Sequence, residues 1–212
     1  MNLKKNKSLT LTELIVSAVL MGIVSIGAVA IDLSLRNMRQ ATSRNAIVAM
    51  RTSAVMADIT RYASQATGHA TNMGIRDMSN NHRTLCIRWE DPATQTPADY
   101  SDDKAVCYSL EDDSRNIYRC EFNPWSAWTE CDTIEDPNAD LVIGTTTGYN
   151  YLDPAQRPHH PEDGFKFLLP TKATPYLEVT LINRYRPEAA ADPVDNPEYR
   201  MTSRIIPGAH SF

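Results

Sequence analysis

The hydrophobic residues of this chain are concentrated in one uncharged segment near its N-terminus. No charged side chain occurs from Leu14 to Ile31, and as an α-helix this segment would rise about 27 Å, close to the apolar thickness of a bilayer. An ordinary secretory signal has a shorter apolar core that ends at a small-residue cleavage site. The pattern therefore predicts a membrane-spanning helix, with residues 9–33 as the transmembrane segment.

Beyond this segment the pattern becomes amphipathic. Apolar residues recur at helical spacing, on one face, at Val48, Val55, Ile59 and Tyr62. No proline occurs before Pro92, and the first strong helix stop is Gly68. We therefore expect one helix from about Leu9 to Thr67, in which residues 34–67 pack against the domain that follows. A plain single-pass anchor with a helical stalk would have the same pattern.

The rest of the chain, residues 68–212, contains short segments in which apolar and polar residues alternate, as is typical of strands. The candidate strands are 84–89, 105–110, 116–120, 141–145, 164–169, 176–183 and 199–206. Residues 68–81 are polar and small, so a loop is predicted there. The predicted fold class is α+β: a long N-terminal helix, membrane-spanning in its first half and amphipathic in its second, packed against an antiparallel β-sheet domain.

Four cysteines, Cys86, Cys107, Cys120 and Cys131, lie close together in sequence without C-x-x-C spacing. Disulfides are the simpler interpretation, although four buried thiols are the alternative. Of the three possible pairings we favour Cys86 with Cys107, which joins two neighbouring candidate strands, and Cys120 with Cys131, which closes a short loop. Because disulfides persist in oxidising compartments, the domain is predicted to lie outside the cytoplasm.

Charge and motifs exclude several function classes. The formal net charge is -5, and no run of Lys and Arg is interleaved with aromatic residues, so nucleic acid is not an expected partner. The chain has no G-x-S-x-G, H-E-x-x-H, G-x-G-x-x-G or P-loop sequence. The sequence therefore predicts no enzyme, no catalytic residue and no cofactor.

Two segments carry side chains that metals use. The pair His159-His160 stands in a Pro-rich segment with aspartates nearby, but adjacent histidines point in different directions, so a solvated loop is favoured. Residues 192–198 offer several oxygen ligands without the glycine and spacing of an EF-hand. The acidic residues of 99–103 and 111–113 are interpreted as exposed turns. No metal site is predicted.

One carboxylate, that of Glu13, stands at the start of the apolar segment. A carboxylate costs about 2.5 to 3.5 kcal/mol at the centre of a bilayer and less near its surface, so it commonly marks a function and needs a positive partner. Lys4, Lys5 and Lys7 are close in sequence, and the first turn of a helix favours a negative group. An interfacial Glu stabilised by the helix dipole is the simplest interpretation.

The sequence Lys7-Ser8-Leu9-Thr10-Leu11-Thr12-Glu13-Leu14-Ile15-Val16 resembles the signature of type IV prepilins. In that family a short basic leader ends in Gly, the mature chain begins with a methylated apolar residue, and its fifth residue is Glu. The resemblance implies a leader of residues 1–8, cleavage by prepilin peptidase between Ser8 and Leu9, and N-methylation of Leu9. Ser8 departs from the family pattern, because Gly nearly always occupies that position.

The resemblance also implies a role for the carboxylate. In an assembled filament Glu13 would pair with the Leu9 amine of a neighbouring subunit, and the cost of an unpaired charge would penalise a wrong axial register. Gly22 and Gly27 could permit close helix contact or local melting during assembly; the alternative is that glycine is simply common in membrane helices. In the domain, the order of the candidate strands resembles that of the larger minor pilins and of pseudopilins of the J/W type.

The predicted function is that of a structural subunit, a minor pilin or pseudopilin, of a type IV pilus or a type II secretion-like filament. The expected partners are prepilin peptidase, other pilin or pseudopilin subunits, the inner-membrane assembly platform and membrane lipid. The precursor would cross the inner membrane once, with residues 68–212 in the periplasm, before it enters the pilus or pseudopilus. The alternative is a membrane-tethered periplasmic enzyme or binding module with an uncleaved anchor.

Overall fold

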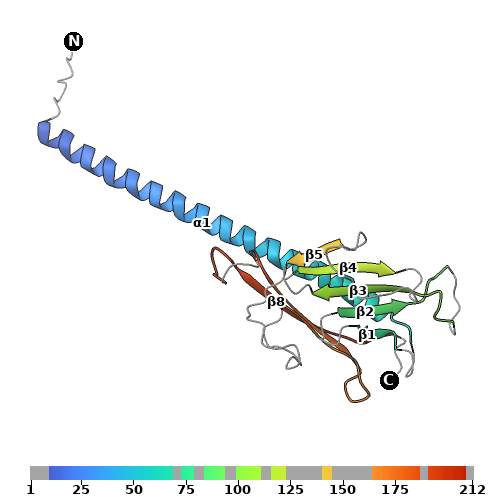
Figure 1. The fold of residues 1–212 in the computed structure, drawn as a ribbon. Helices are drawn as coiled ribbons and strands as arrows, with labels where there is room; N and C mark the ends of the chain where they lie inside the picture. Colours follow the sequence, from blue (N-terminus) through green and yellow to red (C-terminus); the bar gives the residue numbers. More distant parts are fainter. Residues whose placement is uncertain are drawn as a thin grey trace, which may run out of the picture. The chain divides into compact units, whose positions relative to one another are not determined.

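The computed structural model describes residues 10–68, 73–78, 84–93, 99–110, 116–122, 140–144, 164–186 and 191–208. Within these ranges the chain has one helix, α1 (Leu11–Ser64), followed by eight strands (Figure 1). The strands are β1 (Ile75–Asp77), β2 (Thr84–Trp89), β3 (Lys104–Leu110), β4 (Asn116–Phe122), β5 (Asp140–Gly144), β6 (Phe165–Leu168), β7 (Leu177–Arg184) and β8 (Glu198–Ile205). The chain forms two compact units, residues 1–43 and residues 44–212.

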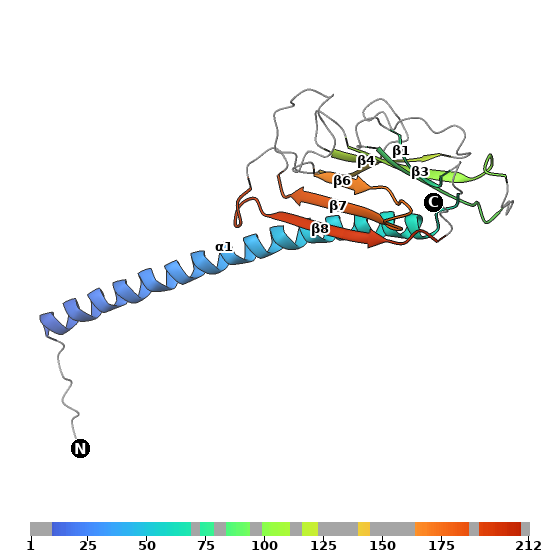
Figure 2. The ribbon, with the colours of Figure 1, turned by 90° about the horizontal axis from the view of Figure 1, so that it is seen from below.

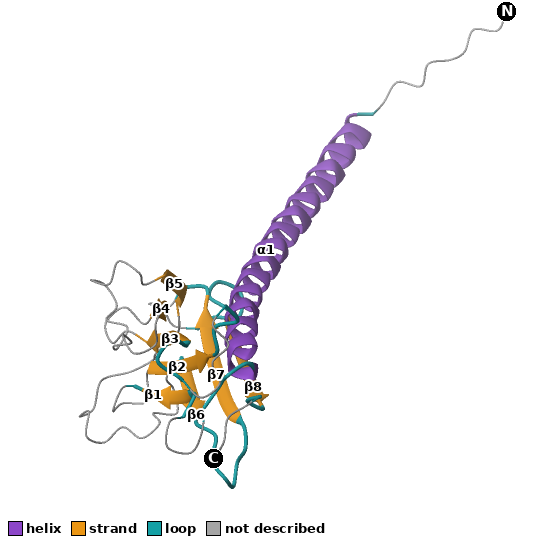
Figure 3. Cartoon of the chain, turned by 90° about the vertical axis from the view of Figure 1, so that its right-hand side faces the viewer, coloured by secondary structure: helices purple, strands orange, loops and turns teal. Residues whose placement is uncertain are grey.

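The strands form two antiparallel sheets, one of β1 to β5 and one of β6 to β8, each in sequence order (Figures 1 and 3). The predicted α+β fold is confirmed, with two sheets in place of the single sheet expected. All seven predicted strands are present, with bounds that shift by no more than two residues. β1 was missed, because a three-residue strand is too short to show the alternation that identifies strands in a sequence.

One hydrophobic core joins both sheets to the second half of α1. The helix buries a stripe of residues, namely Val48, Thr52, Val55, Met56, Ile59 and Ala63. Residues from both sheets, among them Leu85, Val106, Phe165 and Val179, belong to the same core. Figure 2 shows β8 alongside this part of the helix. The predicted packing face is therefore correct, with Tyr62 partly buried at the edge of the core.

The helix ends at Ser64, three residues before the predicted end. The chain turns after Ser64 because residues 66 and 67 pair with a strand: Ala66 forms a β-bridge with Trp89, and the Thr67 N–H donates to the Arg88 carbonyl at 3.0 Å. Strand pairing thus outweighs continuation of the helix. A glycine stop signal at residue 68 marks the loop but does not mark the last helical residue.

Two glycines permit close backbone contacts at this end of the helix. A Cβ atom at Gly74 would lie 2.0 Å from the Thr67 carbonyl oxygen, and one at Gly208 would lie 2.5 Å from the Ser64 carbonyl oxygen. Both distances are shorter than any non-bonded contact allows. The chain before β1 and the chain after β8 therefore need glycine to approach the end of α1.

A polar cluster attaches the helix to the five-stranded sheet. The Tyr108 hydroxyl donates to Asp58 Oδ2 at 2.6 Å, and Arg119 Nε donates to the same oxygen at 3.0 Å. Arg119 also pairs with Glu121 and donates to the Tyr62 hydroxyl at 3.1 Å. Burial and the hydrogen bond to Asp58 raise the pKa of Tyr108, so its hydroxyl stays protonated and remains the donor.

A second charged pair, Arg88 with Asp103, lies inside the domain. Arg88 Nε is 3.3 Å from Asp103 Oδ2, and the two side chains are 0% and 1% exposed. The guanidinium also donates to the Thr67 carbonyl at 3.2 Å and lies 4.2 Å from the centre of the Tyr100 ring. The interpretation of residues 99–103 as an exposed turn is therefore wrong for Asp103, because a buried cation on β2 draws this carboxylate inward.

Burial dominates the ionisation of this pair. It lowers the pKa of Arg88 and raises the pKa of Asp103 to about 6, even though each charge attracts the other. Removing both groups from water thus costs more than their attraction returns. Glu90 and Asp102 add to the effect, because their negative charges further disfavour the Asp103 carboxylate.

We expect the Tyr108→Phe substitution to lower the free energy of unfolding by about 2 kcal/mol, because it deletes a hydrogen bond to a charged acceptor. Tyr118→Phe is the matched control, since the Tyr118 hydroxyl makes no hydrogen bond among the described residues. The control should change stability by less than about 0.5 kcal/mol. Urea unfolding of the full chain in detergent micelles measures both variants. Equal losses of unfolding free energy would contradict the role of the Tyr108–Asp58 hydrogen bond in attaching the helix to the sheet.

The raised pKa of Asp103 predicts a pH dependence of stability. Between its ordinary value near 3.8 and about 6, the folded protein holds a proton that the unfolded chain has released. The free energy of unfolding should therefore fall as pH rises from about 4 to 6, by up to about 3 kcal/mol. Asp103→Asn should remove this contribution. Urea midpoints of both proteins at pH 4, 5, 6 and 7 test this, and parallel curves would contradict it.

Candidate functional site

The N-terminus of α1 is closed by a hydrogen-bonded capping box. The Thr10 N–H and the Thr10 hydroxyl donate to Glu13 Oε2 at 2.9 and 3.0 Å, and the Glu13 N–H approaches Thr10 Oγ1 at 3.3 Å. This arrangement satisfies backbone N–H groups that have no partner within the helix. Thr10 is therefore the N-cap residue, and α1 begins at Leu11 instead of at Leu9.

The capping box adds a structural role to Glu13 that sequence reasoning missed. The signal was present, because Thr10 followed three residues later by Glu13, just before an apolar run, is the T-x-x-E pattern of a capping box. Only Oε2 takes part, and Oε1 accepts no hydrogen bond from the residues that the structure describes. Ser8 and Leu9, the predicted cleavage and methylation positions, lie outside the described residues.

The first part of α1 presents apolar side chains on all sides. From Leu11 to Leu35 its large apolar residues are 48% to 78% exposed in the single chain. By length and composition, α1 contains a segment able to cross a membrane. A helix that is apolar all round requires a lipid or protein environment, which agrees with the predicted membrane-spanning segment.

The hydroxyl groups within this segment are satisfied by the helix itself. Ser17 donates to the carbonyl of Glu13, and Ser25 donates to the carbonyl of Met21 at 2.8 Å. Such bonds matter in an apolar medium, where no water is available to pair a polar group. Glu13 is the one ionisable side chain between Leu11 and Ile31. An exposed ion pair of Asp32 and Arg36, at 2.8 Å, follows the apolar segment.

Gly22 and Gly27 have no internal packing reason to be glycine. A Cβ atom at either position would meet no atom within 4 Å. Glycine lowers helix stability by up to about 1 kcal/mol relative to alanine, so the single chain gains nothing from these residues. The open space beside each glycine is accessible to another helix or to lipid.

The cysteines form a second notable cluster, on the five-stranded sheet. Cys86 of β2 and Cys107 of β3 face each other across the ladder and form a disulfide, which confirms the first predicted pair. Cys120 of β4 is also disulfide-bonded. Cys131, its predicted partner, lies outside the described residues.

Within the acidic segment 192–198, residues 192–196 form a hydrogen-bonded turn, and Glu198 begins β8. Asp192 Oδ1 accepts the N–H groups of Val194 and Asp195 at 2.9 and 2.7 Å, and these bonds lower the pKa of Asp192. Asp195 pairs with Arg44 of α1 at 2.8 Å. One carboxylate oxygen of Asp192 and one of Asp195 are thus bound by donors of the chain. The pair His159-His160 and residues 111–113 lie outside the described part of the structure.

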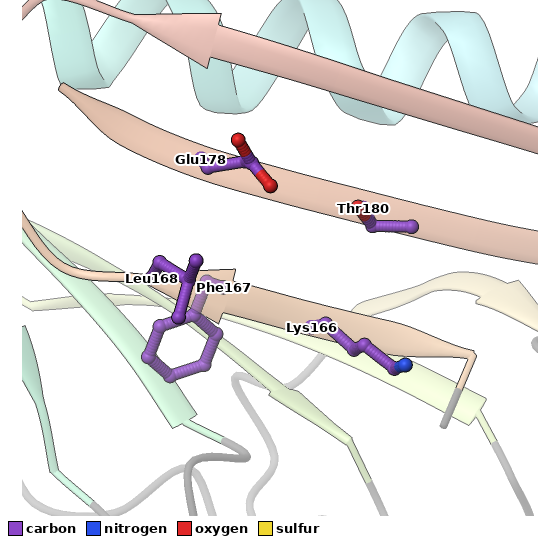
Figure 4. A pocket seen from close by; sticks show the side chains of 5 residues that line it. All are labelled: Lys166, Phe167, Leu168, Glu178 and Thr180. Atoms are coloured by element: carbon purple, nitrogen blue, oxygen red, sulfur yellow. The ribbon is translucent and has the colours of Figure 1, made fainter. Parts of the chain in front are cut away.

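A shallow pocket of about 260 Å³ lies on the three-stranded sheet (Figure 4). Lys166, Phe167 and Leu168 of β6 and Glu178 and Thr180 of β7 line it. The Glu178 carboxylate is bound by Arg204 of β8 at 2.6 Å. The pocket therefore combines the apolar side chains of Phe167 and Leu168 with the polar ends of Lys166 and Thr180, and its one carboxylate is paired with a neighbouring cation.

No protein-family model, curated protein or solved structure matches this chain. The features of the chain that bear on its function are the capped apolar helix and the disulfide-bonded domain.

Proposed function

We propose that the chain is a structural subunit, a minor pilin or pseudopilin, of a type IV pilus or a type II secretion-like filament, and that it assembles through α1. The observation that carries this proposal is the single carboxylate of Glu13 on a helix surface that is otherwise uncharged and apolar through Ile31. A simple membrane tether would use such a group only as a helix cap, which requires no charge. A helix bundle that must select one register also uses the charge.

The capping box leaves one carboxylate oxygen of Glu13 for an interaction with another subunit. Oε2 holds the cap, while Oε1 has no hydrogen bond among the described residues and is available to an ammonium group. Cleavage after Ser8 would create such a group on Leu9, and methylation would keep it positively charged. Because the cap uses only Thr10 and Glu13, cleavage would leave it intact. The same carboxylate would then start its own helix and bind the amine of a neighbouring subunit.

The energetics favour pairing between subunits. Breaking a buried ion pair by removal of one partner costs about 3 to 5 kcal/mol, so a subunit inserted one turn out of register would be rejected. The uncharged surface around Glu13 supplies the low-dielectric environment that makes this penalty large. The apolar surface supplies adhesion, and the charge pair supplies register.

The domain fits an extracytoplasmic location. Cys86 and Cys107 are joined in a disulfide, and Cys120 is also disulfide-bonded, a state that oxidising compartments maintain. In the proposed topology the precursor crosses the inner membrane once, and residues 68–212 lie in the periplasm. The expected partners are prepilin peptidase, other pilin or pseudopilin subunits, and the inner-membrane assembly platform.

Processing of the precursor is the first test. In a host with prepilin peptidase, we expect intact-mass and N-terminal analysis of membrane-extracted protein to show a chain that starts at N-methylated Leu9. In a peptidase-deficient host the chain should keep residues 1–8. Ser8→Gly serves as the positive control, since it restores the residue that the resemblance implies. A chain that still begins at Met1 in both hosts would favour the tethered enzyme or binding module.

Two substitutions separate the roles of Glu13. Glu13→Gln removes the charge but keeps a side chain that serves in a capping box, whereas Glu13→Ala removes both. We expect both variants to insert into the membrane and both to enter filaments at least about tenfold less than the unchanged chain, because loss of a buried pair weakens subunit contact strongly. Incorporation is measured by immunoblotting of sheared filaments against membranes.

The matched control is Asp32→Asn, which neutralises an exposed carboxylate that pairs with Arg36, one turn along the same helix. It should change incorporation by less than about twofold, since exposed pairs contribute little. If Glu13→Gln enters filaments normally while Glu13→Ala does not, the carboxylate acts only as a cap. That result would overturn its proposed role in register.

A further inference from the structure

Three cysteines form a straight row across the five-stranded sheet. Cys107 of β3 stands directly opposite Cys86 of β2 on one side and directly opposite Cys120 of β4 on the other. All three side chains are 0% to 1% exposed and pack in one cluster with Ala105. A sulfur on Cys107 thus has a cysteine neighbour on each flanking strand.

Both neighbours are within reach of a disulfide. The Cα atoms of Cys86 and Cys107 are 4.1 Å apart, which is the narrow spacing of an antiparallel pair without mutual backbone hydrogen bonds. Spacing alternates across a strand, so Cys107 and Cys120 form the wide pair, with Cα atoms about 5.5 Å apart. Disulfides usually span Cα separations of about 4.4 to 6.8 Å, so the wide pair falls within that range, and the bonded pair, at 4.1 Å, lies just below it. The sheet accommodates either bond, but Cys107 can hold only one.

We propose that Cys107 is the pivot of an intramolecular disulfide exchange, in which its sulfur passes between Cys120 and Cys86 while the sheet stays folded. The domain would then acquire its Cys86–Cys107 bond in part through a Cys107–Cys120 isomer. This inference uses only the cysteine row and does not depend on the proposed filament function.

Chain entropy favours the isomer during oxidation. Cys107 and Cys120 are 13 positions apart, against 21 for Cys86 and Cys107. The probability that two residues of a flexible chain meet falls as the three-halves power of their separation in sequence. The shorter loop is therefore favoured about twofold. Since the isomer matches the native register, folding of the sheet does not expel it. The wrong bond therefore persists inside a sheet that is correctly paired.

The third cysteine of the row, Cys86, can convert the Cys107–Cys120 bond into the native one. The Cys86 thiolate attacks Sγ of Cys107 in line with the bond to Cys120, a new sulfur–sulfur bond forms, and the electron pair of the broken bond leaves on Cys120 as a thiolate. The exchange consumes no oxidant. A second disulfide, from Cys120 and the predicted partner Cys131, then forms when two thiols pass two electrons and two protons to the disulfide of a thiol oxidase, which is reduced to a dithiol.

The experiment uses the full chain in detergent micelles with Cys131→Ser, so that three cysteines share one disulfide. Reduced protein is reoxidised with oxidised glutathione, quenched with acid at intervals, alkylated and digested with trypsin. Trypsin separates the three cysteines, because it cuts after Arg88, Lys104 and Arg119. We expect about twofold more Cys107–Cys120 than Cys86–Cys107 in the first samples, followed by conversion to the latter.

The conversion should be independent of protein concentration and should accelerate about tenfold per pH unit between pH 6 and 8, where the thiolate fraction rises in that proportion. The double variant Cys86→Ser, Cys131→Ser can form only the Cys107–Cys120 bond, and this bond should persist. Its circular dichroism spectrum should equal that of the double variant Cys120→Ser, Cys131→Ser, which would show that the sheet folds around either bond. Failure of the first double variant to form its bond, while the second does, would overturn the proposal.

The chain with all four cysteines provides a check that does not depend on any substitution. Its digest needs a second protease that cuts after Glu130, because trypsin leaves Cys120 and Cys131 on one peptide. If the Cys107–Cys120 bond makes up about a quarter or more of all disulfides in the early samples and then disappears, the exchange through Cys107 is supported. Its absence at every time point would overturn it.

Discussion

The helix α1 must satisfy two environments with one continuous backbone, and the rest of the chain depends on how it does so. From Val48 to Ala63 it buries one stripe in the core of the domain. From Leu11 to Leu35 it exposes apolar side chains on every side. An amphipathic stripe needs one protein partner, whereas an apolar cylinder needs lipid or a bundle. The first requirement is met within the chain. The second is met by lipid or by other protein chains.

Different groups stabilise the helix on the sheets and fix its position there. The apolar core supplies most of the stabilisation, at about 1.5 to 3 kcal/mol for each large side chain buried. The charged groups contribute differently. Burial disfavours the ionised forms of both Arg88 and Asp103, so this pair adds little net stability and instead connects β2 to the backbone just after α1. The Asp58 cluster fixes the helix in the same way from its side, since one carboxylate oxygen accepts hydrogen bonds from two strands.

Periodicity in the sequence predicted the helix face and the strands well, because burial imposes a repeat of 3.6 or 2.0 residues on the chain. It predicted the Cys86–Cys107 bond for a related reason, since neighbouring strands bring such residues together. What it missed depends on contacts between distant segments. The burial of Asp103 follows from its ion pair with Arg88 and from the hydroxyl of Thr67, which donates to Asp103 Oδ2. The helix end at Ser64 follows from pairing of residue 66 with β2. The capping box was different, because Thr10 and Glu13 are adjacent on one turn and their spacing was readable.

The two faces of the five-stranded sheet are linked through register. Along β3, Val106, Tyr108 and Leu110 belong to the core shared with the helix, while Ala105 and Cys107 belong to the cysteine cluster. A slip of β3 by one residue would turn Cys107 toward the helix and take Tyr108 away from Asp58. The disulfide between Cys86 and Cys107 therefore excludes the same error that would detach the helix. The covalent link thus holds the one register in which Tyr108 still attaches the helix to the sheet.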